Sequence, residues 1–167
     1  INTLLKQRKL SPAKTFELYR RKGELHIERH DFLREKEIDD FHKRYDTWVS
    51  KGQKGKEPSV SYKKSRAELA KAANAFRALS SKFPKHSRAD YAVFTLAKTL
   101  SRLGNDNAIL YFKRFVRDFP KSKLVPEARL ALAEYYFENR KVSLAIKNYK
   151  EVAKFKKATI YPYAIYK

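Results

Sequence analysis

The 167-residue sequence contains no cysteine, and this absence removes several kinds of chemistry. Disulfide bonds, thiolate metal sites and cysteine nucleophiles are all excluded. A chain without cysteine suits the cytosol and equally suits an envelope protein that uses no disulfides. The missing cysteines therefore leave the compartment open.

Glycine and proline are also scarce, with 4 and 6 residues, which is too few for a sheet protein with many turns. No apolar run approaches the ~18 residues that a bilayer crossing needs, so we predict no transmembrane segment. No signal peptide is visible. Because the chain opens on Ile1 and contains no methionine, we expect its native start to have been removed. The composition as a whole favours helix.

Acidic residues are few in relation to basic ones. Lysine and arginine number 39 against 18 aspartates and glutamates, which gives a formal net charge of +21 spread along the whole chain. Such an excess attracts anionic partners of several classes, including nucleic acid, acidic protein and anionic lipid. The hydrophobic content of 43%, with 11 Phe and 11 Tyr, is sufficient for a folded core.

No catalytic or metal-binding pattern is recognisable. His26 and His30 share one helix face, but Glu28 lies on another side and no third ligand accompanies them, so we interpret them as two solvent-facing histidines. The segment Gly52–Lys56 lacks the spacing of a phosphate-binding loop and is interpreted as a flexible loop. The carboxylates stand mostly beside Lys or Arg, which gives no support to a general acid/base pair. We therefore predict no enzyme, no metal and no cofactor.

The sequence contains an internal repeat of 36 residues. Phe83-Pro84-Lys85 returns as Phe119-Pro120-Lys121, and proline at this position ends a helix. Apolar residues at three- and four-residue steps predict helices over 65–82, 90–103, 108–118 and 144–155, with another opening at Pro126 and a last one beginning near Pro162.

The positions inside these helices correspond from one repeat to the next. First helices carry Leu96-Ala97 and then Leu132-Ala133. Second helices carry a small residue followed by two large ones, namely Ala72/Phe76/Leu79, Ala108/Phe112/Phe115 and Ala145/Tyr149/Val152. Small residues let neighbouring helices approach, and the large residues fill the space between them.

The Leu-Ala pair, the Gly104 turn, the Ala-x3-aromatic pattern and the closing proline resemble tetratricopeptide repeats (TPR). The resemblance covers residues 65–167. The Phe-Pro-Lys linkers resemble a subgroup common in bacterial cell-envelope proteins, of the outer-membrane assembly lipoprotein and cell-division coordinator types. Two departures from the pattern are a turn at Gly104 that is one residue short and the absence of a closing proline over 152–157.

The resemblance implies an all-α, right-handed α-solenoid of stacked helix–turn–helix repeats over residues 65–167, with the last repeat incomplete. Residues 1–64 are expected to form a helical N-terminal segment with a flexible loop over 50–59. This segment is an extended first repeat helix, a terminal cap or a bent pair of helices.

In such a stack the first helix of each repeat lines a concave groove, and the resemblance places a partner-binding surface there. Several of its aromatic side chains are expected to be exposed and without packing partners, which marks an interaction surface. In the alternative, the N-terminal segment or a further repeat fills the groove. The groove residues implied are Tyr91, Phe94, Lys98, Ser101, Glu127, Leu130, Glu134, Phe137, Tyr163 and Tyr166.

These observations predict a non-catalytic scaffold for protein–protein interaction that binds a protein or peptide, acidic or of mixed charge. Self-association through the uncapped last repeat is a second expectation. The alternative function is electrostatic binding of nucleic acid or another anionic polymer. The linker resemblance implies the bacterial cell envelope, either the periplasm or the inner face of an outer membrane, with the cytoplasm as the alternative.

Overall fold

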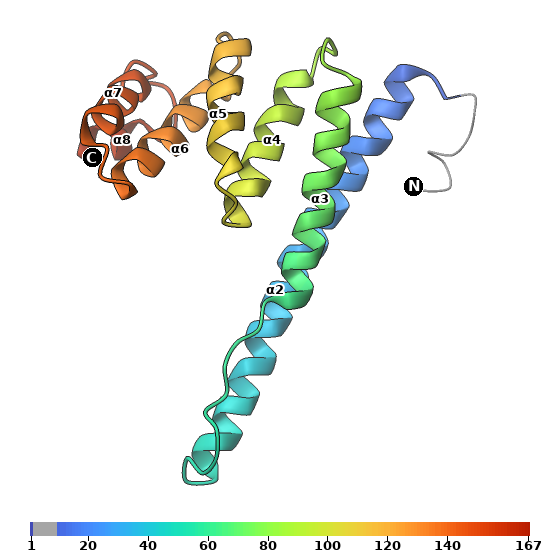
Figure 1. Ribbon diagram of the computed structural model, residues 1–167, viewed down its shortest axis with the longest axis vertical. Helices are drawn as coiled ribbons and strands as arrows, with labels where there is room; N and C mark the ends of the chain where they lie inside the picture. Colours follow the sequence, from blue (N-terminus) through green and yellow to red (C-terminus); the bar gives the residue numbers. More distant parts are fainter. Residues whose placement is uncertain (2–9) are drawn as a thin grey trace. The chain divides into compact units, whose positions relative to one another are not determined.

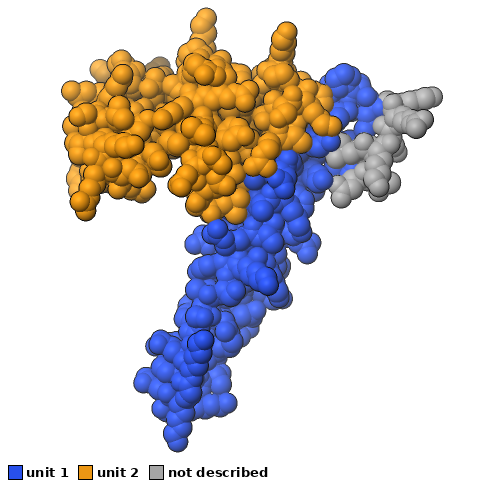
Figure 2. Space-filling model, in the orientation of Figure 1, with its two compact units in different colours: residues 1–75 blue, residues 76–167 orange. Residues whose placement is uncertain are grey.

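The computed structural model describes Ile1 and residues 10–167, and within them the chain is all-α, with seven helices and no strand (Figure 1). The predicted all-α helical-repeat fold is confirmed. The chain forms two compact units, residues 1–75 and 76–167, and the division falls inside helix α3 (Figure 2).

Unit 1 is built on one long helix, α2 (Pro12–Ser50), of 39 residues. Ser11 caps its start, since its Oγ accepts a hydrogen bond from the Lys14 backbone N–H at 3.3 Å. Pro12 stands in the first turn, where the missing N–H costs nothing. The helix is unbroken from Pro12 to Ser50.

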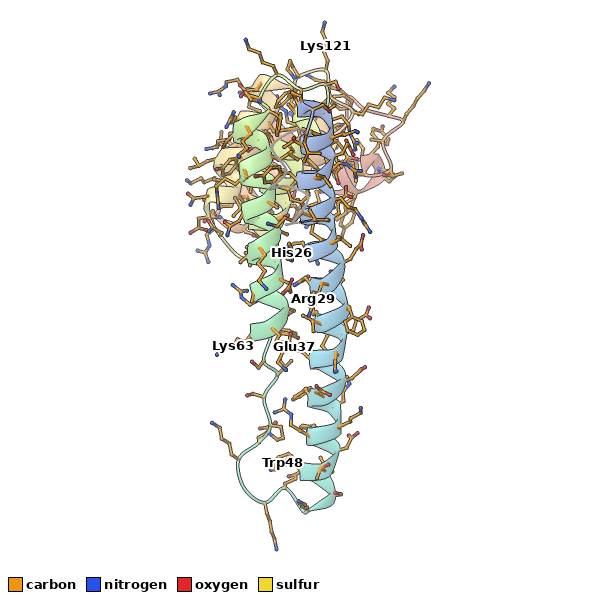
Figure 3. The ribbon with its side chains drawn as sticks, turned by 90° about the vertical axis from the view of Figure 1, so that its right-hand side faces the viewer. His26, Arg29, Glu37, Trp48, Lys63 and Lys121 are labelled. Carbon is orange, nitrogen blue, oxygen red and sulfur yellow. The ribbon has the colours of Figure 1, made fainter. Side chains whose placement is uncertain are left out.

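The first half of α3 (Lys63–Lys82) lies antiparallel against α2. The Glu37 carboxylate accepts hydrogen bonds from the backbone N–H groups of Lys64, at 2.8 Å, and Ser65, at 3.4 Å. Glu37 therefore satisfies backbone N–H groups at the start of α3 that have no partner within that helix, and it fixes the register of α3 against α2 (Figure 3). Residues 51–62 connect the two helices without further helix.

The interpretation of His26 and His30 as solvent-facing was wrong. His30 is buried, with 5% of its surface exposed, and its Nδ1 lies 2.9 Å from the Ser65 carbonyl oxygen. His26 Nδ1 lies 2.7 Å from Glu68 Oε2 on α3. The four-residue spacing did place both rings on one side of α2, but that side faces α3.

Unit 2 continues as a succession of short helices that pack in order along the chain. They are α4 (Ala89–Arg102), α5 (Asn107–Asp118), α6 (Val125–Glu138), α7 (Val142–Val152) and α8 (Tyr161–Tyr166). Helix α7 ends at Val152, three residues before the expected end, because Val152 is its last buried residue and the following turn exposes Phe155.

The core of unit 2 consists of the repeated residues. The Leu-Ala pairs of α4 and α6 are buried, as are the aligned side chains Ala108/Phe112/Phe115 and Ala145/Tyr149/Val152. Complete burial of a side chain such as Phe115 contributes roughly 1.5–3 kcal/mol before entropic costs. This core fixes the direction in which the remaining residues of α4 and α6 point.

Helices α4 and α6 end in the same motif, 36 residues apart. Gly104, at φ 68°, and Arg140, at φ 56°, both follow their helix in the left-handed conformation. In each case the backbone N–H of the next residue donates a hydrogen bond to the carbonyl oxygen of the third-last residue of the helix: Asn105 N–H to Leu100 O at 3.0 Å, and Lys141 N–H to Tyr136 O at 2.8 Å. This is the Schellman arrangement, for which glycine is the usual residue.

Candidate functional site

The ten residues predicted to bind a partner occupy equivalent positions on α4, α6 and α8. We call this set the candidate face. Residues 91, 94, 98 and 101 follow steps of three and four along α4, and residues 127, 130, 134 and 137 repeat them on α6. Tyr163 and Tyr166 occupy the first two of these positions on α8. Because this spacing follows one side of a helix, each set forms a row beside the buried Leu-Ala pair.

On α4 the aromatic residues of the candidate face do have packing partners, contrary to expectation. Phe94 is half-buried, and its ring centroid lies 6.0 Å from that of Phe112 and 5.5 Å from that of Phe115. Tyr91 meets Phe76 edge-on at 6.2 Å and lies under the Arg88 guanidinium at 5.1 Å. Both rings are therefore partly buried in the core of unit 2, Phe94 against the α5 aromatics and Tyr91 against Phe76.

On α6 and α8 the aromatic residues are exposed as expected. Phe137 exposes 51% of its surface, Tyr163 42% and Tyr166 85%. The Lys167 ammonium lies 5.0 Å from the Phe137 ring centroid and 5.4 Å from that of Tyr163. The hydrogen bond with Tyr163 raises the pKa of Lys167, so its cationic form is favoured. The Lys167 cation thus contacts exposed aromatic rings on both α6 and α8.

Glu134 lies in the same row as Phe137. The hydroxyl of Tyr149, on α7, donates a hydrogen bond to the Glu134 carboxylate. Burial of the phenol, together with this bond, raises the pKa of Tyr149 well above its usual range. The hydroxyl therefore remains a donor at neutral pH. Lys98, at the equivalent position on α4, is exposed, so the face carries opposite charges one repeat apart.

Glu127, at the start of α6, presents a carboxylate oxygen with unused hydrogen-bonding capacity. Its Oε2 is buried, and no donor reaches it among the described residues. Buried polar atoms in folded proteins usually have a partner, and this oxygen is closed off from the surface, so it offers no accessible acceptor to a binding partner.

Ser101 is exposed at the end of the α4 row and lines a pocket of about 180 Å³ formed with the α4–α5 turn and α6. Tyr135 and Glu138 of α6 line the same pocket. The structure thus brings the end of the α4 row close to α6, beside the candidate face.

Residues 91–122 match a family model described as a tetratricopeptide repeat. The match supports the tetratricopeptide repeat family for this chain. It spans α4, α5 and the start of the turn that follows. Helix α6 carries the same Leu-Ala pair 36 positions later, and α7 carries a corresponding set of one small and two large core residues 37 positions later. No curated protein and no solved structure matches the chain.

Tetratricopeptide repeats generally mediate contacts between proteins and are typically non-catalytic. Among the described residues, no group of histidines and carboxylates could hold a metal ion. No helix in that part of the chain is long and apolar enough to cross a membrane.

Lys167 and Tyr149 belong to the site geometry but were not among the predicted site residues. Lys167 could have been found from its spacing, since it stands four positions after Tyr163 on the same helix side. Tyr149 was recognised only as a core residue. No pattern in the sequence shows that its hydroxyl reaches Glu134, because that contact depends on how α6 and α7 pack.

Proposed function

We propose that the protein is a non-catalytic scaffold that binds a segment of another protein along the candidate face. The observation that carries the proposal is the exposure of Phe137 on α6 and of Tyr163 and Tyr166 on α8, with the Lys167 ammonium over the rings of both Phe137 and Tyr163. Exposed aromatic clusters are typical anchor points in protein interfaces. The family match supports the same class of function.

The chemistry of the face indicates the kind of segment that it suits. Leu130 and Phe137 offer apolar anchors on α6, while Lys98 and Glu134 offer opposite charges in consecutive repeats. An extended or helical segment with apolar anchors and mixed charge fits these groups better than a uniformly acidic tail.

Site-specific photo-crosslinking tests this proposal. A photoreactive residue at Phe137 should capture a partner protein from cells, whereas one at Leu110 should not. Leu110 is a matched control because it exposes 59% of its surface but lies on α5, away from the candidate face. Equal capture at both positions, or crosslinks only within the same chain, would contradict the proposal.

The biological setting that we propose is a complex in the bacterial cell envelope. It rests on the resemblance of the Phe-Pro-Lys linkers to those of envelope repeat proteins. Fractionation of the native full-length protein should recover it with the envelope. Recovery with the cytosol alone would contradict this setting while leaving the binding surface untouched.

A further inference from the structure

A second surface of unit 2 repeats with the same period as the core. Phe83, Phe119 and Phe155 stand 36 residues apart, and each opens a turn that carries lysine two positions later, at Lys85, Lys121 and Lys157. Lys123 and Lys156 add a second lysine to two of these turns. All five lysines are exposed.

The topology places these turns at one edge of unit 2. Each short connection reverses the chain, so alternate turns return to the same side of the stack. The α3–α4, α5–α6 and α7–α8 turns therefore share an edge (Figure 1). Figure 3 shows Lys121 projecting outward from the middle one of the three. We call the five lysines at this edge the lysine edge.

Of the acidic residues close to the lysine edge, Asp90, Asp118 and Glu151 are already engaged, whereas Glu127 has a buried oxygen that no donor reaches among the described residues. Asp90 accepts a hydrogen bond from Ser122 Oγ at 2.6 Å, and Asp118 pairs with Arg117 at 2.7 Å. Glu151 pairs with Lys154 at 2.6 Å. None of the five lysines forms an ion pair within the described part of the chain. The lysine edge therefore presents positive charge without an ion-pair partner at each of the three turns.

We propose that the lysine edge binds the phosphate backbone of duplex nucleic acid without reading its sequence. Lysine approaches phosphate as a point charge, whereas recognition of base edges relies more on arginine and amide side chains. Such contacts position a duplex and carry no sequence information. This surface is separate from the candidate face, so the inference does not depend on the proposed function.

The spacing of the turns favours a linear polyanion. Successive turns are two helices apart at 8–10 Å per helix, so three turns extend over roughly 32–40 Å. A duplex carries one charge per ~1.7 Å, and each turn meets phosphate whatever its register. Repeats rotate slightly from one to the next, so the turns follow a curved path, which fits a duplex better than the plane of a membrane.

The ring of Phe119 lies 5.7 Å from the ring of Phe115, and Phe83 is half-buried. Single-strand binding needs several open aromatic faces for base stacking, and of the three turn phenylalanines only Phe155 is exposed, so the turns offer mainly charge. Backbone contact with a duplex is therefore the favoured mode.

Fluorescence anisotropy with a labelled 20-base-pair duplex between 50 and 200 mM KCl tests the proposal. With five phosphate contacts the wild-type affinity should fall roughly 10²- to 10³-fold over this range. The variant K85Q/K121Q/K157Q should bind at least tenfold more weakly at 50 mM, and its salt slope should decrease by about 3. Circular dichroism verifies that it stays folded.

The matched control is K113Q/K141Q/K147Q, which removes the same charge from exposed positions away from the edge and from the candidate face. Its salt slope should change by less than about 1. Equal losses in the two variants would overturn the proposal, because the net charge and not the edge would then be responsible. Absence of duplex binding by the wild type at 50 mM, or an edge variant that loses only its binding to phosphatidylserine vesicles, would also overturn it.

Discussion

His26 of α2 and Glu68 of α3 are joined by a hydrogen bond of 2.7 Å between Nδ1 and Oε2. An ionised carboxylate only accepts, so the imidazole nitrogen donates. Lys71 lies 2.7 Å from the other carboxylate oxygen, and Arg29 approaches it at 3.9 Å. Glu68 is itself buried, so three cationic or donor groups surround one carboxylate between the two helices of unit 1.

This arrangement predicts acid sensitivity of the α2–α3 pair. The hydrogen bond with Lys71, followed by that with His26, lowers the pKa of Glu68 below its ordinary value of 4.5. The associated stability is present above pH 4.5 and is lost as the pH falls through the lower folded value. Unfolding followed by far-ultraviolet circular dichroism should show this loss in the wild type and a flatter pH profile in Glu68→Gln.

Asp39→Asn is the control for this measurement, since Asp39 is exposed and forms no ion pair among the described residues. Its pH profile should follow that of the wild type. A Glu68→Gln profile that is also parallel to the wild type would show that Glu68 does not contribute to acid unfolding.

Phe137→Ala should weaken binding of the protein partner by roughly 1–3 kcal/mol, because Phe137 is an exposed anchor on the candidate face. Its thermal stability should stay close to that of the wild type. Calorimetric titration of the captured partner and a melting curve measure the two effects separately. Wild-type affinity in a folded Phe137→Ala variant would remove Phe137 from the interface.

Phe94→Ala should instead destabilise unit 2, by about 2 kcal/mol, since its ring packs on Phe112 and Phe115. Urea unfolding followed by circular dichroism should show a lower midpoint. If the urea midpoint of Phe94→Ala is unchanged and partner binding is weakened, Phe94 acts as a surface anchor for the partner and not as a core residue.

Tyr149→Phe should cost about 1–2 kcal/mol, because it removes the hydrogen bond to Glu134 and leaves that carboxylate without its donor. Burial, reinforced by Glu134, raises the pKa of Tyr149 above its ordinary value of 10.0. As the pH rises, the Tyr149 hydroxyl therefore ionises in the unfolded chain before it ionises in the folded protein. The stability due to Tyr149 declines as the pH rises above 10. Urea unfolding between pH 8 and 11 should show a smaller decline in the variant than in the wild type.

Gly104 and Arg140 provide a matched pair of backbone tests. Gly104→Ala should destabilise unit 2 by about 1 kcal/mol from the left-handed conformation alone, because an added Cβ meets no atom within 4 Å. Arg140→Gly at the equivalent position should be stabilising by up to about 1 kcal/mol. Opposite shifts in the urea midpoint are expected, and shifts of the same sign would contradict this explanation.

The repeat core could be predicted from the sequence because period and residue size determine it. Leu96 and Ala97 recur as Leu132 and Ala133, and all four are buried. Helix ends marked by glycine or proline were also close to their observed positions. The end of α7 was placed too late because Phe155 continues the apolar pattern after the helix has stopped.

The environments of individual side chains were harder to predict. A helical pattern shows that His30 and Phe94 point to a particular side of their helices, but not how near the neighbouring helix comes. His30 is buried against the Ser65 carbonyl, and Phe94 is half-buried between the α5 aromatics. Both depend on interhelical packing, which involves residues far apart in the chain.

The length of α2 has a consequence for how unit 1 responds to local unfolding. At 1.5 Å per residue its 39 residues extend about 58 Å, and α3 begins only opposite Glu37. Beyond that point α2 meets the connecting segment, through Arg44 to Ser59 O at 3.1 Å and Trp48 to Gly55 O at 3.4 Å. Amide hydrogens over 38–50 should therefore exchange with solvent well before those over 16–37, and limited proteolysis should first cut the connecting segment.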